Sequence, residues 1–216
     1  MKHLIIIGAR GFGREVYHSA VESIGYGIEF DIKGYLDDKA DALSQYEGYP
    51  ALIGSVETYQ PQEDDVFVCA LGDVKWKKHY AQIIEEKGGE FISLIHKTAY
   101  VAPTAKYGRG CILLAQARLQ SDATIGDFVT MQPCSLLAHD TKVGNYCHFN
   151  CYSFAGGGIE VGDLVTVHTS GMIMPHIKIG NNVVIGAGSV ATKDIADNLT
   201  IFGNPARVLP IMNENN

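Results

Sequence analysis

The chain has 216 residues, 46% hydrophobic and 19% charged, which is the composition of a globular protein of one large or two modest domains. A net charge of -7 argues against nucleic acid as a partner, because nucleic-acid-binding proteins carry excess positive charge. The longest apolar run near the start, 4–7, is too short for a signal peptide or a membrane span. Five cysteines without an export signal favour reduced thiols and a cytoplasmic location.

Residues 1–92 are predicted to form an α/β unit of the Rossmann type, because apolar strand-like runs alternate with helical patterns. We expect strands near 4–7, 34–36 and 66–71, and helices over about 11–24 and 75–87.

The first predicted strand runs into a helix through the glycine-rich segment 8–13, Gly-Ala-Arg-Gly-Phe-Gly. Glycines at such a turn let backbone amides approach phosphate oxygens at a helix N-terminus. The spacing G-x-x-G-x-G differs from the dinucleotide fingerprint G-x-G-x-x-G, so the turn does not indicate NAD. Taken alone, a tight strand-to-helix turn explains the glycines as well as a ligand does. Asp37 and Asp38 follow the second strand, where they would either read a ribose or base edge or solvate a turn.

Residues 93–216 carry a six-residue repeat, or hexad, that predicts a parallel β-helix. Sixteen successive positions, from Val101 in steps of six to Ala191, are all apolar, and the residue two before each is small or β-branched. Glycine also recurs at every third hexad from Gly108 to Gly180. Short strands broken at each hexad by a turn form a three-sided coil of three hexads, and stacked coils bury one column of side chains.

This repeat region resembles the hexapeptide-repeat acyltransferases, and its tail is similar to their closing signature, with segments 185–190, 192–195 and 203–206. The resemblance implies a left-handed parallel β-helix and an acetyl-CoA co-substrate contacted by the tail. It also implies a homotrimer whose active sites lie between the β-helices of neighbouring chains. No metal is expected.

The segment from Ala138 to Gly144 resembles the family's His-Asp catalytic motif, with His139 as general base and Asp140 fixing its tautomer. Gly157 lies three hexads, or one coil, beyond His139, and the family's glycine there can offer its amide to the thioester carbonyl. Strand alternation turns His148 outward, and its family counterpart meets acetyl-CoA. We therefore expect His139, His148 and Gly157 to converge on one reaction centre. The motif alignment adds two further contacts with acetyl-CoA, Thr169 and Ala187.

The combination of an α/β unit with a β-helix looks like the nucleotide-sugar N-acetyltransferases of the bacillosamine, perosamine and sialic-acid O-acetyltransferase group. In that group the N-terminal unit holds the nucleotide of the acceptor, so the resemblance implies N-acetylation of a nucleotide-linked amino sugar, in polysaccharide biosynthesis. It assigns the phosphates to Arg10, Gly11 and Phe12, the base to Asp37 and Asp38, and closure of the pocket to Gly72 and Lys75. Phe12 stands where relatives that bind UDP-sugars often have histidine.

Three alternatives stay open at this point. An O-acetyltransferase would use the same histidine base on a sugar hydroxyl, and a non-catalytic protein would only bind the nucleotide-sugar. A zinc enzyme of the γ-carbonic anhydrase type would need histidines one or two whole coils apart, and no pair among His139, His148, His168 and His176 has that spacing. The nucleotide, the sugar and the length of the acyl chain are not determined by the sequence.

Overall fold

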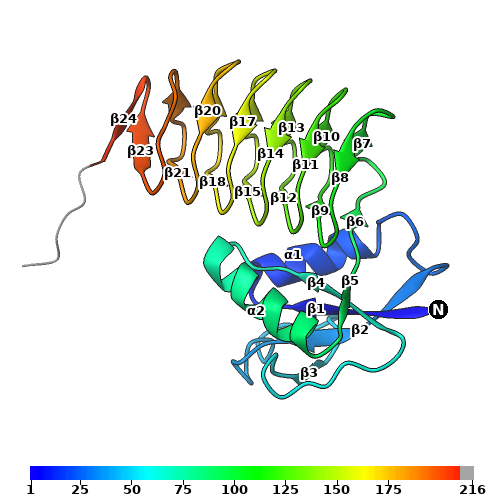
Figure 1. Ribbon diagram of the computed structural model, residues 1–216. Coiled ribbons are helices and arrows are strands. Elements are labelled where there is room, and N and C mark those ends of the chain that lie inside the picture. Colours follow the sequence, from blue (N-terminus) through cyan, green and yellow to red (C-terminus); the bar gives the residue numbers. More distant parts are fainter. Residues whose placement is uncertain (210–216) are drawn as a thin grey trace, which may run out of the picture.

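The computed structural model describes residues 1–209 as an α/β unit packed against a three-sided stack of short parallel strands (Figure 1). The α/β unit is a five-stranded parallel sheet of order β3-β2-β1-β4-β5. Its elements are β1 (Lys2–Ile7), α1 (Gly11–Ala20), β2 (Phe30–Leu36), β3 (Leu52–Gly54), β4 (Asp65–Cys69), α2 (Val74–Glu86) and β5 (Glu90–Phe91).

The two helices cover opposite faces of this sheet, which explains the unbroken apolar run of β1. Leu4 and Ile6 pack in the same cluster as Val16 of α1, whereas Ile5 and Ile7 pack with Ile84 of α2. A parallel strand buried on both faces needs apolar residues at every position. Among residues 1–209, no helix has both the length and the apolar character needed to cross a membrane.

Several expected boundaries in the α/β unit are corrected. The helix expected over 11–24 ends at Ala20, because the chain then turns and the amide of Ile24 donates to the carbonyl of Ile95 at 2.9 Å. β2 begins at Phe30, earlier than expected, and the short strands β3 and β5 carry too little pattern to be predicted from sequence.

From residue 94 the chain winds into a three-sided parallel β-helix, which confirms the fold predicted from the hexad. Each strand pairs with the strand three hexads away, as Leu119 does with Leu137. The first side contains β7 (Tyr100–Val101), β10 (Arg118–Leu119), β13 (Leu136–Leu137), β16 (Phe154–Ala155), β19 (Met172–Ile173) and β22 (Val190–Ala191). The second side contains β8 (Lys106–Tyr107), β11 (Thr124–Ile125), β14 (Lys142–Val143), β17 (Glu160–Val161) and β20 (Lys178–Ile179). The third side contains β6 (Leu94–Ile95), β9 (Ile112–Leu113), β12 (Thr130–Met131), β15 (His148–Phe149), β18 (Thr166–Val167), β21 (Val184–Ile185), β23 (Thr200–Gly203) and β24 (Ala206–Val208).

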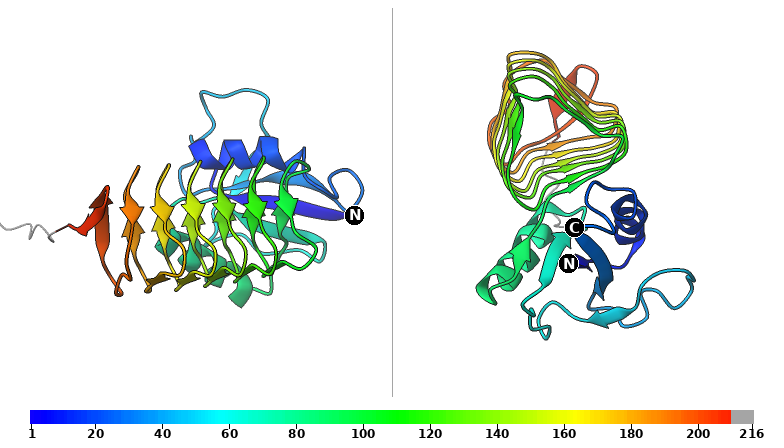
Figure 2. Two further views of the ribbon diagram at one scale, coloured as in Figure 1. Left: turned by 90° about the horizontal axis from the view of Figure 1, so that it is seen from above. Right: turned by 90° about the vertical axis from the view of Figure 1, so that its right-hand side faces the viewer.

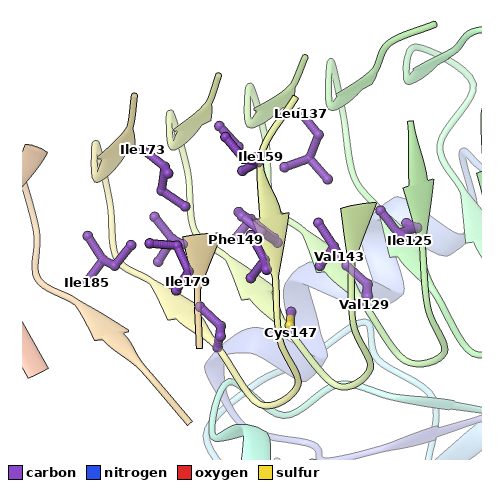
Figure 3. Close-up of a cluster of buried hydrophobic side chains, with 14 of the residues drawn as sticks. Ile125, Val129, Leu137, Val143, Cys147, Phe149, Ile159, Ile173, Ile179 and Ile185 are labelled. Atoms are coloured by element: carbon purple, nitrogen blue, oxygen red, sulfur yellow. The ribbon is translucent and has the colours of Figure 1, made fainter. Parts of the chain in front are cut away.

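The interior of the coils is the apolar column that the hexad predicts (Figure 3). Hexad positions from Leu113 to Ala191 are all buried, and Leu137 and Phe149 are fully enclosed. Tyr107 is the exception, since its side chain was expected inside and is 45% exposed. It lies on β8, the edge strand of the second side, where no earlier coil of that side covers it.

The α/β unit packs against the third side of the β-helix (Figure 2). Phe128 stacks on Tyr146 with ring centroids 4.9 Å apart and meets Phe91 edge-on. Lys77 of α2 is 1% exposed, and its Nζ donates to Thr130 Oγ1 at 2.9 Å and to the carbonyl oxygen of Phe128 at 3.3 Å. This interface fixes which side of the coil the α/β unit covers.

Burial lowers the pKa of Lys77 from 10.5 to about 8, because no carboxylate accompanies the charge into the interface. The folded state therefore releases this proton at lower pH than the unfolded chain, so stability should rise with pH between about 8 and 10.5. Burial also raises the pKa of nearby thiols, which oppose this trend only above about pH 9. These thiols are Cys69, Cys111 and Cys147.

Between pH 7.5 and 9, we expect the free energy of unfolding of the wild type to increase by about 1 kcal/mol more than that of Lys77→Met. Urea unfolding of both proteins at each pH measures this difference. Subtracting the value for the variant removes the contributions of the titrating groups that both proteins share. A constant difference across this range would contradict the assignment.

Candidate active site

Two neighbouring coils bring His139, Asp140 and Gly157 together at the corner between the first and second sides. His139 Nδ1 lies 2.7 Å from Asp140 Oδ2, and both side chains are 65% exposed. A Cβ added to Gly157 would lie 2.6 Å from His139 Cε1 and Nε2, so the imidazole rests on the glycine backbone. With Nδ1–H donating to the carboxylate, Nε2 keeps its lone pair and is able to accept a proton.

The backbone around Gly157 leaves its amide available. The carbonyl of Gly157 accepts from the amide of His176 at 3.0 Å, and the amide of Gly158 donates to the carbonyl of His139 at 3.0 Å. Within residues 1–209, no hydrogen-bond acceptor is found for the Gly157 amide itself. The corner thus combines a base with a free N–H donor one coil away.

A cavity of about 470 Å³ lies in the α/β unit, between the glycine-rich turn and α2. Five of the residues assigned to the acceptor line it: Arg10, Phe12, Asp37, Asp38 and Gly72. Two do not. Gly11 lines a smaller neighbouring cavity, and Lys75 is absent from the walls of both. Trp76 and Tyr80 line the larger cavity instead, and sequence analysis missed them although their spacing of four places them on one face of α2.

The two neighbouring aspartates have different surroundings. Asp37 is 7% exposed at its side chain, and its oxygens accept from the amides of Ala9 and Lys39, both at 2.9 Å. These bonds hold the strand-to-helix turn in shape. Asp38 is exposed and accepts from the hydroxyl of Tyr80. Of the two, Asp38 is the carboxylate with a free edge toward the cavity.

His148 faces outward from the third side, as strand alternation predicts, but the α/β unit covers it, so that it is 1% exposed. Its ring meets the Phe12 ring edge-on at 5.5 Å, and its Nε2 lies 3.2 Å from Gln132 Nε2. With the amide nitrogen of Gln132 as donor, the ring proton of His148 is on Nδ1, which has no partner among the described residues. Burial lowers the pKa of His148 well below 6.5, so the ring is neutral.

Within one chain, His148 does not converge with His139 and Gly157. His148 lies half a coil beyond His139, so it is on the opposite part of the triangle with the apolar column between. Viewed along the coil axis, the triangular section meets the α/β unit with one side only (Figure 2). Convergence of His148 with His139 and Gly157 would therefore need a neighbouring chain, and it stays a prediction.

The remaining two predicted residues, Thr169 and Ala187, are exposed and one coil apart, at the corner between the third and first sides. They follow the side that carries His148 and are remote from the corner of His139. No cluster of three metal-binding side chains is found among residues 1–209.

Comparison with known proteins decides the class of this chain. The PglD N-terminal domain family matches residues 3–84. A GDP-perosamine N-acetyltransferase of Escherichia coli O157:H7 is 25% identical over 198 residues, 92% of this chain and 81% of the relative. The acetyltransferase domain of PglB from Neisseria gonorrhoeae is 28% identical, with a TM-score of 0.88 over 97% of this chain and 100% of that one. The chain is therefore an acyltransferase, and it is similar to the nucleotide-sugar acetyltransferase group along most of its length.

The fold of this acyltransferase extends to more distant relatives. PerB from Caulobacter crescentus, solved with CoA and GDP-perosamine, is 23% identical and has a TM-score of 0.86 over 97% of this chain and 98% of that one. These likenesses confirm the left-handed parallel β-helix that the hexad and the tail resemblance implied.

The packing of His139 on Gly157 generates a test. In the acyltransferase, Gly157→Ala should displace the imidazole, because the added methyl would lie 2.6 Å from its ring atoms. We expect turnover, measured as CoA thiol release, to fall by about tenfold or more, since small misplacements of catalytic groups are costly.

A double-mutant cycle isolates the cause of that loss. If Gly157→Ala acts through the ring, it should do little further harm in a His139→Ala background. An equal loss in both backgrounds would show that the methyl acts elsewhere, and the circular dichroism of each variant reports on its fold.

Proposed function

We propose that this acyltransferase uses acetyl-CoA to acetylate the amino group of a nucleotide-linked sugar. The observation that carries the proposal is the His139–Asp140 pair seated on the free amide of Gly157, in a chain whose α/β unit holds a separate cavity of about 470 Å³. The gonococcal PglB domain, also solved with acetyl coenzyme A, supports the donor. The name of the Escherichia coli relative supports a nucleotide-linked amino sugar as acceptor.

The chemistry follows from the atoms at the corner. Asp140 accepts the hydrogen bond from Nδ1–H and holds the tautomer in which Nε2 of His139 is basic. As the acceptor nitrogen forms its bond to the thioester carbonyl carbon, Nε2 takes the proton of that nitrogen. The carbonyl oxygen becomes an oxyanion and accepts from the amide of Gly157. Collapse breaks the carbon–sulfur bond, the imidazolium returns its proton to the departing sulfur, and the products are the amide and CoA.

A complete site needs two chains, because His139 and the acceptor cavity lie on different parts of the triangle. We infer a homotrimer in which the corner of one protomer faces the cavity and the third side of the next. The first side supports this, since the four coils that follow Arg118 each present an apolar residue outward: Leu136, Phe154, Met172 and Val190. The second side instead carries charges such as the Lys178–Glu160 pair at 2.9 Å. Acetyl-CoA would then lie along the exposed Thr169 and Ala187 of one protomer, at the corner that follows the side of the buried His148. We expect the reaction to take place in the cytoplasm.

His139 should behave as a general base. His139→Ala should lower kcat by about 10²–10⁴-fold, the usual contribution of positioned proton transfer, with little change in the KM for acetyl-CoA. Asp140→Asn should be less harmful, because it disturbs the orientation of the base without removing it. Raising the pH should partly rescue His139→Ala, since more of the acceptor amine is then neutral. Normal turnover of this variant at neutral pH would show that another residue is the base. A separate test distinguishes N-acetylation from O-acetylation, because an amide product resists hydroxylamine and an ester does not.

Mixed trimers test the shared site. Gly72 lines the cavity, and the space around an added Cβ is open, so Gly72→Trp should fill the cavity without disturbing the fold. His139→Ala and Gly72→Trp should each be inactive alone. Trimers assembled at random from equal amounts of the two variants should have roughly a quarter of their sites intact. Such a site takes its corner from a Gly72→Trp chain and its cavity from a neighbouring His139→Ala chain.

Two measurements bear on the outcome of this experiment. Light scattering should give a trimer of 23.4-kDa chains, whereas a fully active monomer would contradict the assembly. Mixed trimers of the correct mass with no recovered activity would place the whole site within one chain.

A further inference from the structure

An exposed tryptophan forms one wall of the acceptor cavity. Trp76 lies in the first turn of α2, lines the cavity, and is 55% exposed. A large aromatic side chain with this much surface contributes little to the core, and its exposed face is available to a flat apolar ligand. The glycine-rich turn also lines this cavity, and its Arg10 side chain is 69% exposed.

The tryptophan is supported from behind by aromatic packing. The Trp76 ring stacks on the Tyr80 ring with centroids 5.6 Å apart and an interplanar angle of 27°, and the ring of His79 meets it edge-on at 5.4 Å. Tyr80 in turn donates its hydroxyl to Asp38 Oδ2. Burial and the neighbouring carboxylate raise the pKa of Tyr80, so the phenol keeps the proton that it donates. The indole plane and the Asp38 carboxylate are thus held together by one intervening residue.

We propose that Trp76 is the stacking platform for the base of the acceptor nucleotide, and that Asp38 beside it selects guanine. This inference rests on the proposed function, since it assumes that the acceptor is carried by a nucleotide. Arg10 and the glycine-rich turn at one wall suit the diphosphate, and the aromatic wall suits the base. A cavity of about 470 Å³ falls within the usual range for small-molecule sites.

The choice of guanine follows from the hydrogen bonds that Asp38 still needs. Tyr80 occupies Oδ2, and within residues 1–209 no protein donor is found for Oδ1. An ionised carboxylate only accepts hydrogen bonds, so it favours a base with donors on its edge. Guanine presents an N–H and an amino group side by side, whereas uracil and thymine present one N–H between two carbonyl oxygens, which repel a carboxylate. A purine also overlaps the indole over a larger area than a pyrimidine does.

The chain itself supplies the probe, because Trp76 is its only tryptophan. The full-length protein is titrated with GDP and with UDP, while tryptophan fluorescence and calorimetric heat are recorded in parallel. We expect saturable quenching by GDP with the same Kd as calorimetry, and a Kd for UDP about tenfold weaker or more. Calorimetric binding of GDP without any change in fluorescence would overturn the platform. UDP binding as tightly as GDP would overturn the selection by Asp38.

Variants separate stacking from packing. Trp76→Leu should weaken GDP binding by about 5- to 100-fold, the usual range for a base stacked on an aromatic ring, and Trp76→Phe should restore part of it. Asp38→Asn should narrow the gap between GDP and UDP. Tyr107→Leu, which removes an exposed aromatic of the first coil, is the matched control and should leave both affinities unchanged. Equal GDP affinity in Trp76→Leu and wild type would also overturn the platform.

The failure of the proposed function gives a different result. If neither GDP nor UDP gives calorimetric heat at millimolar concentration while acetyl-CoA binds, the acceptor is not a nucleotide, and the proposed substrate class is wrong together with the platform. If both nucleotides bind but Trp76 does not respond, the substrate class survives and only the platform is lost.

Discussion

The register of the coils, three hexads to each turn, is the constraint on which the rest of the structure depends. Backbone hydrogen bonds between successive coils hold residues that are three hexads apart in sequence at the spacing of neighbouring strands. The pairing of Leu137 with Ala155 is an example. The register extends through the corners, where Asp140 has a positive φ of 58° and its amide donates to the carbonyl of Ser121 at 3.1 Å. Left-handed backbone is costly for residues other than glycine, and the stacked hydrogen bonds of the coils hold it in place.

The same register creates the corner site. A residue at a corner has neighbours only in the coils before and after it, so the ring of His139 lies on whatever occupies the equivalent position of the next coil. Glycine at 157 leaves space for the imidazole and leaves an amide exposed beside it. Any side chain at this position would remove both features, so one glycine determines both the position of the imidazole and access to the N–H donor.

The interface between the two units determines what the corner can meet. Lys77, Phe128 and the Phe12–His148 contact attach the α/β unit to the third side, which is opposite the corner of His139. The cavity of the α/β unit is therefore lined by residues remote from the corner of His139 in the same chain. This arrangement makes the proposed activity depend on assembly of the trimer, because association would bring His139 of one chain to the cavity of another. In the proposed function, it would also separate recognition of the nucleotide from acyl transfer, so that each could vary without disturbing the other.

The sequence by itself determined the coil period, the apolar column and the pairing of His139 with Asp140 and Gly157. These features were predictable because the hexad converts a spacing along the chain directly into proximity in space. The fold class of the α/β unit was also predictable, from its alternation of apolar strands and helices.

Only the tertiary structure decided the features that no period encodes. Asp37 and Asp38 are adjacent in sequence, yet their environments differ. The Asp37 carboxylate accepts hydrogen bonds from the amides of Ala9 and Lys39, whereas Asp38 stays exposed and accepts from Tyr80. Trp76 lines the cavity where Lys75 was expected, because the rotation of α2 on the sheet selects one face of the helix. His148 is buried although strand alternation only directs it outward, because a separate unit covers that side. Each of these outcomes depends on packing between segments far apart in the chain, and such packing leaves no regular spacing in the sequence.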